Sequence, residues 1–401
     1  MKRVRISLQI RNVLLITEVC QPRPAVRAFN DNKIAQLVVL NLSRFELRVD
    51  RGERVLSLLP VISMGSEAAR ILMMSRRAHI LALFERSFYI QCEQGIICVG
   101  VASLGKGPLH VLLQSKQDQL PSELSSALAI GVDSRSPLGV ENHSAQRIDH
   151  ADDELRHCFT GKVSSSGLNT LSLKLTRDVL DAVAPAHPEG FGWILNNDCW
   201  QSHVESPEAA TASLGLLDSS FRKQCVPALL DLSQWLGKSL RSCAQPSFNT
   251  VAGLDDCARI DTHRCAAVNL DIPLSLSTLL GTGPGLTPAG DDLLAGVMLF
   301  LHRINRADLA SSLWKVLEPW LASRTNPVSS AHLRLAAQGQ CSEHLLLLLD
   351  HVVKENSADN TDMTHKMIAD IQSLTNRIGS SSGWDTLAGM TLVLRALKNY
   401  P

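Results

Sequence analysis

The stretch GTGPGLTPAGDDLLAGVMLFL, residues 281–301, joins a segment rich in glycine and proline to an apolar run with helical spacing. Thr287 is a good N-cap and Pro288 a good first helical residue, so the sequence predicts a helix that starts there. Asp291 and Asp292 fall in the first turn, where acidic side chains complement the helix dipole. The stretch therefore predicts a helical domain in which a flexible loop leads directly into a buried helix.

The glycines of this loop predict an anion site. Gly281, Gly283 and Gly285 free the backbone to turn its N–H groups toward one point, and the helix N-terminus adds donors and partial positive charge. Gly290 costs the helix roughly 1 kcal/mol relative to alanine, which indicates close approach by another backbone or by a ligand. We predict a cradle for a phosphate or a carboxylate; the alternative is a plain connection. No GK[ST] follows, and GTGPGL departs from GxGxxG, so neither the Walker A nor the Rossmann pattern is present.

The stretch has one echo later in the chain. Residues 290–296 read GDDLLAG and residues 383–389 read GWDTLAG, and both copies lead into an apolar helix. Asp292 and Gly296, like Asp385 and Gly389, are four residues apart and share a helix face. If the two helices cross at their glycines, the two carboxylates face each other and either share a proton or hold a cation. The alternative for the second copy is a capping box made by Ser382 and Asp385.

Between the copies, SRTNPVSSAHL offers further polar groups. Arg324 has a fork-shaped donor for a carboxylate, and Thr325, Ser329 and Ser330 have hydroxyls. One of the serines is expected to cap a helix that starts near Ala331, and another to contact a substrate.

The first third of the chain predicts strands instead of helices. Apolar and polar residues alternate in RVRISLQI (3–10) and in RFELRV (44–49), and FYIQCEQGIICVGV predicts a hairpin that turns at Glu93, Gln94 and Gly95. We predict an α+β protein: a small β-barrel-like or sandwich-like domain at 1–115, a linker or long loop at 116–150, and a mainly helical domain at 151–401. The helical domain is expected to have glycine-rich loops at its helix N-termini.

Composition narrows the function classes. Lys+Arg and Asp+Glu are equal at 39 each, so no overall charge attracts nucleic acid or an anionic membrane. No continuous apolar stretch is long enough for a signal sequence or a membrane span. The ten cysteines form no CxxC pair, and Cys257, His263 and Cys265 lack zinc-ligand spacing. These features predict a cytoplasmic protein with reduced thiols and no metal site.

The motifs resemble those of the AllH-like family, which was long catalogued as a domain of unknown function. The resemblance rests on GTGPGLTPAGDDLLAG, RTNPVSSAHL and SSSGWDTLAG, with GKGPLHV of the β-rich region as a further similarity. It implies a subunit of oxamate carbamoyltransferase in anaerobic allantoin and purine nitrogen breakdown. That activity exchanges a carbamoyl group between phosphate and oxamate, yielding oxalurate in one direction and carbamoyl phosphate in the other, and it requires partner subunits. This chain is longer than the usual member, with extra polar segments around the linker.

The residues and the resemblance together give the expected roles. Carbamoyl transfer needs a phosphate site, a carboxylate site and donors for the carbonyl oxygen, and Asp292 is expected to accept a proton from the oxamate nitrogen. The catalytic candidates are Asp291, Asp292 and Asp385. The candidates for binding the anionic substrate are Gly281, Gly283, Gly285, Thr287, Gly290, Arg324, Thr325, Ser329, Ser382 and Gly383. No organic cofactor is expected, and Mg²⁺ stays open. The alternative is a non-catalytic scaffold or metabolite-binding subunit.

Overall fold

The computed structural model of the 401-residue chain describes residues 3–10, 13–20, 35–37, 44–50, 54–75, 77–115, 118–121, 138–141, 158–165, 177–185, 190–205, 216–241, 272–353 and 361–398. The linker predicted at 116–150 lies mostly outside these ranges. Cys257, His263 and Cys265 lie outside them as well.

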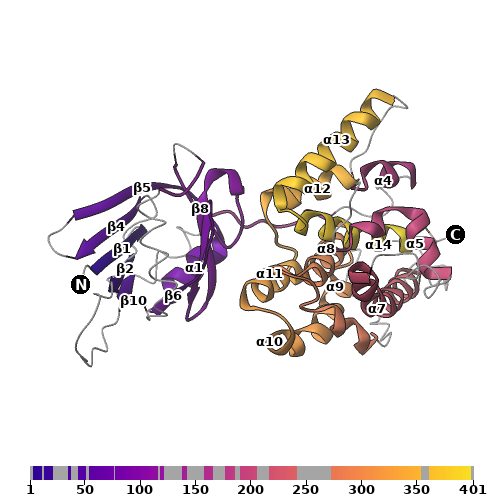
Figure 1. Cartoon of the computed structure of the whole chain (residues 1–401), viewed down its shortest axis with the longest axis horizontal. Helices are drawn as coiled ribbons and strands as arrows, with labels where there is room; N and C mark the ends of the chain where they lie inside the picture. Colours follow the sequence, from indigo (N-terminus) through magenta and orange to yellow (C-terminus); the bar gives the residue numbers. More distant parts are fainter. Residues whose placement is uncertain are drawn as a thin grey trace, which may run out of the picture. The chain divides into compact units, whose positions relative to one another are not determined.

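The chain divides into two compact units. The first comprises residues 1–162 together with 340–346, and the second comprises 163–339 together with 347–401. Figure 1 shows the strands of the first unit in indigo to purple and the helices of the second in magenta to yellow. The boundaries expected from composition, at 115 and 150, stay a prediction.

The N-terminal region consists of strands, as its alternating pattern predicted, and these strands form a mixed sheet. Strands β5 to β9 lie in the order β5-β9-β8-β7-β6, with β8 and β9 parallel and the other neighbours antiparallel. Strands β4, β1 and β2 continue beyond β5, and β10 pairs with β6, β3 and β2. The β7–β8 hairpin turns between Cys92 and Gly95, where the sequence predicted it. A barrel or sandwich form stays a prediction. The strands are β1 (Arg3–Ile10), β2 (Val13–Cys20), β3 (Ala35–Leu37), β4 (Arg44–Asp50), β5 (Arg54–Met64), β6 (Arg77–Leu83), β7 (Ser87–Cys92), β8 (Gly95–Val101), β9 (His110–Leu113) and β10 (Leu138–Glu141).

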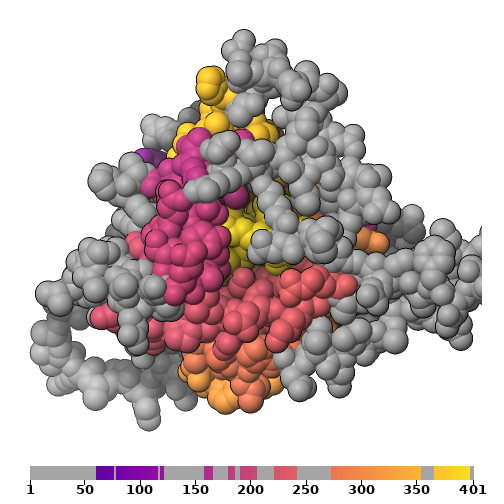
Figure 2. Space-filling view, turned by 90° about the vertical axis from the view of Figure 1, so that its right-hand side faces the viewer, coloured from indigo at the N-terminus to yellow at the C-terminus, as the bar shows by residue number. Residues whose placement is uncertain are grey.

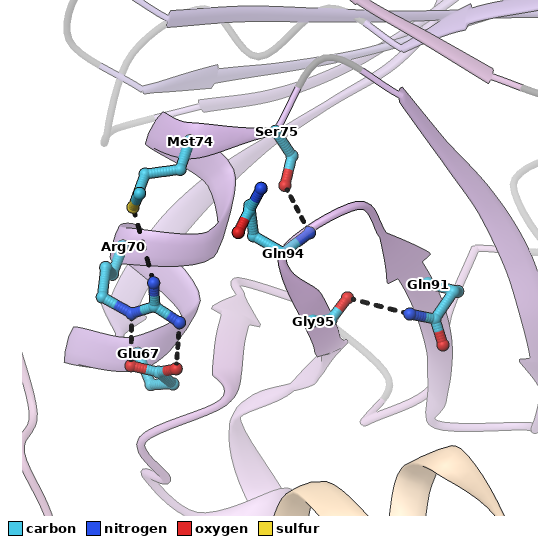
Figure 3. Close-up of polar contacts among 7 residues, drawn as sticks. All are labelled: Glu67, Arg70, Met74, Ser75, Gln91, Gln94 and Gly95. Atoms are coloured by element: carbon cyan, nitrogen blue, oxygen red, sulfur yellow. Dashed lines mark hydrogen bonds and ion pairs between the residues drawn. The ribbon is translucent and has the colours of Figure 1, made fainter. Parts of the chain in front are cut away.

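Helix α1 (Ser66–Met74) packs against this sheet through four buried apolar residues, Ala68, Ala69, Ile71 and Leu72. Its other face forms the polar contacts drawn in Figure 3, where Arg70 bonds Glu67 at 2.5 and 2.8 Å. After the helix, Ser75 Oγ accepts a hydrogen bond from the amide of Gln94 in the β7–β8 turn. The bond between Ser75 and Gln94 joins the end of α1 to the hairpin.

The C-terminal region is mostly helical, as predicted. Its helices with described residues are α4 (Arg177–Val183), α5 (Asn197–Glu205), α7 (Leu216–Arg241), α8 (Ala289–Arg303), α9 (Ala307–Leu317), α10 (Leu321–Arg324), α11 (Pro327–Ala337), α12 (Glu343–Val353), α13 (Thr361–Ile378) and α14 (Ser382–Lys398), with 3-10 turns η4 (Gly192–Leu195), η5 (Leu274–Leu279) and η6 (Glu318–Trp320). Helices α8 and α14 form the centre of the unit: Val297, Met298 and Phe300 of α8 and Leu392 and Val393 of α14 are fully buried.

Candidate functional site

Helices α8 and α14 cross at the glycines of the two echoed motifs. A Cβ atom on Gly296 would lie 2.0 Å from the carbonyl oxygen of Thr386, and one on Gly389 would lie 2.0 Å from that of Leu293. When residues 290–296 are aligned with residues 383–389, Gly296 corresponds to Gly389 and Leu293 to Thr386. The two contacts are therefore equivalent. The expected close crossing is therefore confirmed, and it requires glycine on both helices.

The N-termini of these two helices lie together. The hydroxyls of Thr287 and Ser382 are hydrogen-bonded at 2.8 Å, across 95 residues of sequence. Thr287 is consequently not the N-cap: α8 begins at Ala289 with Pro288 at the cap position and no side-chain cap bond. The predicted helix start was wrong by one residue because the threonine hydroxyl bonds a distant partner.

The glycines near the helix starts are needed because the backbone of another segment packs directly against each of them. A Cβ on Gly290 would lie 1.9 Å from the carbonyl oxygen of Leu279, and one on Gly383 would lie 2.1 Å from that of Thr375. A Cβ on Gly281 would meet the carbonyl oxygen of Arg324 at 1.7 Å. The close approach expected at Gly290 is thus made by another segment of the chain.

Asp291 organises the loop from within. Its Oδ1 accepts a hydrogen bond from the amide of Gly281 at 2.8 Å, and its Oδ2 accepts bonds from the hydroxyls of Thr325 and, at 2.7 Å, Ser329. The side chain is buried, and this burial raises the pKa of Asp291 although the hydrogen bonds from Thr325, Ser329 and Gly281 oppose the change. Three of the candidate residues therefore meet at one carboxyl group.

Asp292 is placed differently from its neighbour. Its Oδ2 is buried and has no hydrogen-bond partner. Burial raises the pKa of Asp292 well above its ordinary value, and the negative charges of Asp385 and Asp291 add to this, whereas hydrogen bonds with Ser382 and Thr287 oppose it. A carboxyl group in these surroundings favours its protonated form.

Asp385 reaches a third segment of the unit. It is fully buried, and its Oδ1 accepts a hydrogen bond from the amide of Phe191 at 2.6 Å. Gly190 precedes that amide with φ 53°, and a Cβ there would lie 2.3 Å from the same Oδ1. The expected capping box is wrong: Ser382 is the first residue of α14, and Asp385 bonds the turn at Gly190 and Phe191 instead.

The loop from Gly281 to Pro288 has backbone amides without hydrogen-bond acceptors among the described residues. Gly281, Gly283 and Gly285 all have positive φ, at 70°, 110° and 96°. Among the described residues, the amides of Gly283, Gly285 and Leu286 have no hydrogen-bond acceptor. A Cβ on Gly285 would meet open space. At Gly285 the loop therefore leaves room beside its backbone, whereas a Cβ on Gly283 would lie 2.9 Å from the amide nitrogen of Ala289.

Arg324 and the N-cap of α11 differ from expectation, because neither Ser329 nor Ser330 caps this helix. Arg324 is exposed and lies over the ring of Trp320, 5.1 Å from its centroid. Helix α11 begins at Pro327, and Asn326 is its N-cap, accepting from the amide of Ser329 at 3.0 Å. Asn326 also donates to the carbonyl oxygen of Leu286 at 2.9 Å. Asn326 was not predicted as a site residue, although asparagine before proline is a known helix start.

The described ranges hold no group of three or more His, Cys, Asp or Glu side chains placed to bind a metal ion. The helices described there include none that is both long and apolar enough to span a membrane.

All the residues of this site from Gly281 to Gly389 lie in one segment that is similar to a known family. Residues 279–394 match the family model described as oxamate carbamoyltransferase subunit AllH. No solved structure matches the chain. The two echoed helix starts therefore fall in a segment that matches the family of oxamate carbamoyltransferase subunit AllH, which confirms the resemblance of the three motifs that lie in this segment.

Proposed function

We propose that this chain is a subunit of a carbamoyltransferase that acts on oxamate or oxalurate with carbamoyl phosphate or phosphate. We place its ligand site at the joined N-termini of α8 and α14. The family match supports the activity class, and the observation that supports the site is the buried Oδ2 of Asp292, which has no hydrogen-bond partner beside a loop with unbonded amides. A buried polar atom without a partner indicates a missing ligand group.

The charge balance of the site favours an anion. Two helix N-termini bring partial positive charge to one place. Asp291 accepts three hydrogen bonds and Asp385 accepts the Phe191 amide, so both carboxyl groups are held by the protein. The raised pKa of Asp292 favours its neutral form. A phosphate at the loop would therefore meet less negative charge than the sequence suggests.

In the proposed reaction, the amides of Gly283, Gly285 and Leu286 bind phosphate or the carbonyl oxygen that gains negative charge. In the catabolic direction, phosphate attacks the carbamoyl carbon of oxalurate, the bond from that carbon to the oxamate nitrogen breaks, and carbamoyl phosphate forms. The departing nitrogen needs a proton, and protonated Asp292 donates it. In the reverse direction, ionised Asp292 accepts the proton of the attacking nitrogen. Thr287 and Ser382 hold the carboxyl group in position.

Partner subunits and the cellular setting belong to this proposal. We infer that the chain acts in a complex with other carbamoyltransferase subunits in the cytoplasm, in the anaerobic breakdown of allantoin. No metal is needed for the steps above. In a variant of the proposal in which Asp292 and Asp385 are both ionised, these two residues would hold Mg²⁺, which would balance their negative charge.

The alternative is a scaffold or metabolite-binding subunit. One observation favours it: Gly290, Gly296, Gly383 and Gly389 are all explained by contacts between backbones. It does not explain the unpaired Oδ2 of Asp292.

Activity of the assembled transferase separates the two. Asp292→Asn keeps the shape of the side chain and removes proton transfer, so we expect kcat to fall by about 10²–10⁴-fold. Glu318→Gln, at an exposed position, is the matched control and should keep full activity. An unchanged kcat in Asp292→Asn would support the alternative, a scaffold or metabolite-binding subunit.

A further inference from the structure

A second group of buried polar atoms lies around Trp193, outside the site described above. Trp193 of η4 and His203 of α5 are 1% and 2% exposed, and their rings lie 4.5 Å apart. The indole Nε1 of Trp193 is buried and has no hydrogen-bond partner. His203 Nδ1 lies 2.7 Å from the carbonyl oxygen of Cys199, so it carries a proton and donates to that oxygen. The other nitrogen, Nε2, which is an acceptor when the imidazole is neutral, is also buried without a partner.

A buried guanidinium lies against the same ring. Arg222 of α7 is 6% exposed, and its guanidinium carbon is 5.1 Å from the centroid of Trp193. Its one hydrogen bond within the described ranges goes to Cys199 Sγ, a weak acceptor, at 3.8 Å. No carboxylate in those ranges forms an ion pair with it. Buried arginines are nearly always paired, because an unpaired buried charge is strongly destabilising.

A neighbouring arginine shows the ordinary arrangement. Arg395 of α14 lies over Trp200, 5.6 Å from its centroid, and donates to the carbonyl oxygens of Ile194 at 2.5 Å and Leu195 at 3.4 Å. Its donors are thus used by the backbone of η4, whereas those of Arg222 are not. In Figure 2 the magenta atoms, which belong to residues before α7, lie next to the red segment of α7 on the face shown.

The three groups define the chemistry of a ligand. Arg222 offers a positive charge with several N–H donors, Trp193 offers one N–H donor, and His203 offers one acceptor. Carboxylate oxygens match the two donors. The acceptor requires an N–H or O–H on the same ligand. We propose that Trp193, His203 and Arg222 form a binding site for a small carboxylate that bears an adjacent N–H or O–H group.

This site is connected to the first through the main chain. Phe191, whose amide bonds Asp385, lies two residues before Trp193. The inference takes the ligand class from the buried groups, and it rests on the proposed function only in the choice of oxamate as the probe. Oxamate carries a carboxylate and an amide N–H₂. Pyruvate has the same shape with a methyl group in place of the amide nitrogen.

The test follows the indole N–H signal of Trp193 by ¹H–¹⁵N NMR, assigned with Trp193→Phe, while oxamate or pyruvate is added to the full chain. We expect the signal to move on adding oxamate, with a Kd about tenfold lower than for pyruvate, because pyruvate leaves His203 Nε2 unpaired. His203→Phe keeps the ring contact and should remove the difference between the two ligands. Arg222→Met should abolish the shift for both.

Several results would overturn the proposal. These are a Trp193 signal that does not move up to 20 mM oxamate, which is about the limit for a weak metabolite site, equal affinity for oxamate and pyruvate, or a shift that persists in Arg222→Met. If Trp193→Phe does not fold, single Trp→Phe variants at the other five tryptophans assign their indole signals, and the remaining signal is that of Trp193. Asp292→Asn should leave the oxamate shift of Trp193 intact. The two proposals can therefore fail separately.

Discussion

Asp291 and Asp292 are adjacent in sequence, yet the fold gives them different surroundings. Asp291 accepts hydrogen bonds from Gly281, Thr325 and Ser329, which ties the loop to α11. Asp292 has a buried oxygen without a partner. Two carboxylates at a helix N-terminus predict a functional role for the pair. The sequence does not predict which of the two accepts hydrogen bonds from the rest of the protein.

The raised pKa of Asp292 predicts how stability depends on pH. A carboxyl group whose folded pKa lies above the unfolded value binds its proton more tightly in the folded state, so stability is lost as pH rises from the unfolded value, about 4, through the folded one. Asn carries no charge at any pH. We therefore expect Asp292→Asn to unfold at a higher temperature than the wild type at pH 8, and at nearly the same temperature at pH 4. Thermal unfolding of both proteins between these pH values checks this, and a gap that does not change with pH would contradict it.

At the scale of helices, the echoed motifs predicted the crossing of α8 and α14. In each motif a glycine lies four residues after an aspartate, and because it has no side chain the other helix can approach closely there. Helix caps were predicted less well. Thr287 bonds Ser382 instead of its own helix, and Asp385 bonds Phe191, 194 residues away. Local capping rules cannot anticipate contacts that only the folded unit creates.

The crossing predicts opposite effects of the same substitution in two helices. Glycine to alanine normally stabilises a helix by about 0.5–1 kcal/mol. Gly296→Ala places a Cβ 2.0 Å from the carbonyl oxygen of Thr386, so we expect it to lower the free energy of unfolding by about 1–3 kcal/mol. Gly237→Ala in α7 is the matched control, because the nearest atom to its Cβ is an Arg241 side-chain nitrogen at 3.6 Å. Urea unfolding measures both, and a Gly296→Ala protein as stable as Gly237→Ala would argue against a close crossing.

For the whole molecule, composition predicted strands followed by helices, and the two units follow that order. It did not predict that residues 340–346 return to the N-terminal unit. There the amide of Cys341 bonds the carbonyl oxygen of Gly161 at 2.9 Å, and Lys162 pairs with Gln340. Such pairing of distant segments has no local signature in the sequence.

Because residues 340–346 belong to the N-terminal unit, we expect a substitution against them to affect that unit and not the other. Gly161 has φ 62°, and a Cβ there would lie 2.1 Å from the carbonyl oxygen of Cys341. We expect Gly161→Ala to speed amide hydrogen exchange in residues 54–115, whereas Gly296→Ala should speed it in α8 and α14. Exchange that rises equally in both regions for either variant would contradict two separate cores.

The central claim is that an anionic substrate binds at the joined N-termini of α8 and α14 beside Asp292. The measurement that tests it most directly is thermal unfolding of the purified chain with carbamoyl phosphate, phosphate or oxamate, each with and without Mg²⁺. A ligand at a hundred times its Kd adds about 2.7 kcal/mol to the free energy of unfolding. We expect carbamoyl phosphate to raise Tm of the wild type and of Glu318→Gln, and to have little effect on Asp292→Asn and on Gly285→Val, which distorts the loop. The same rise in all four proteins, or in none, would contradict the claim.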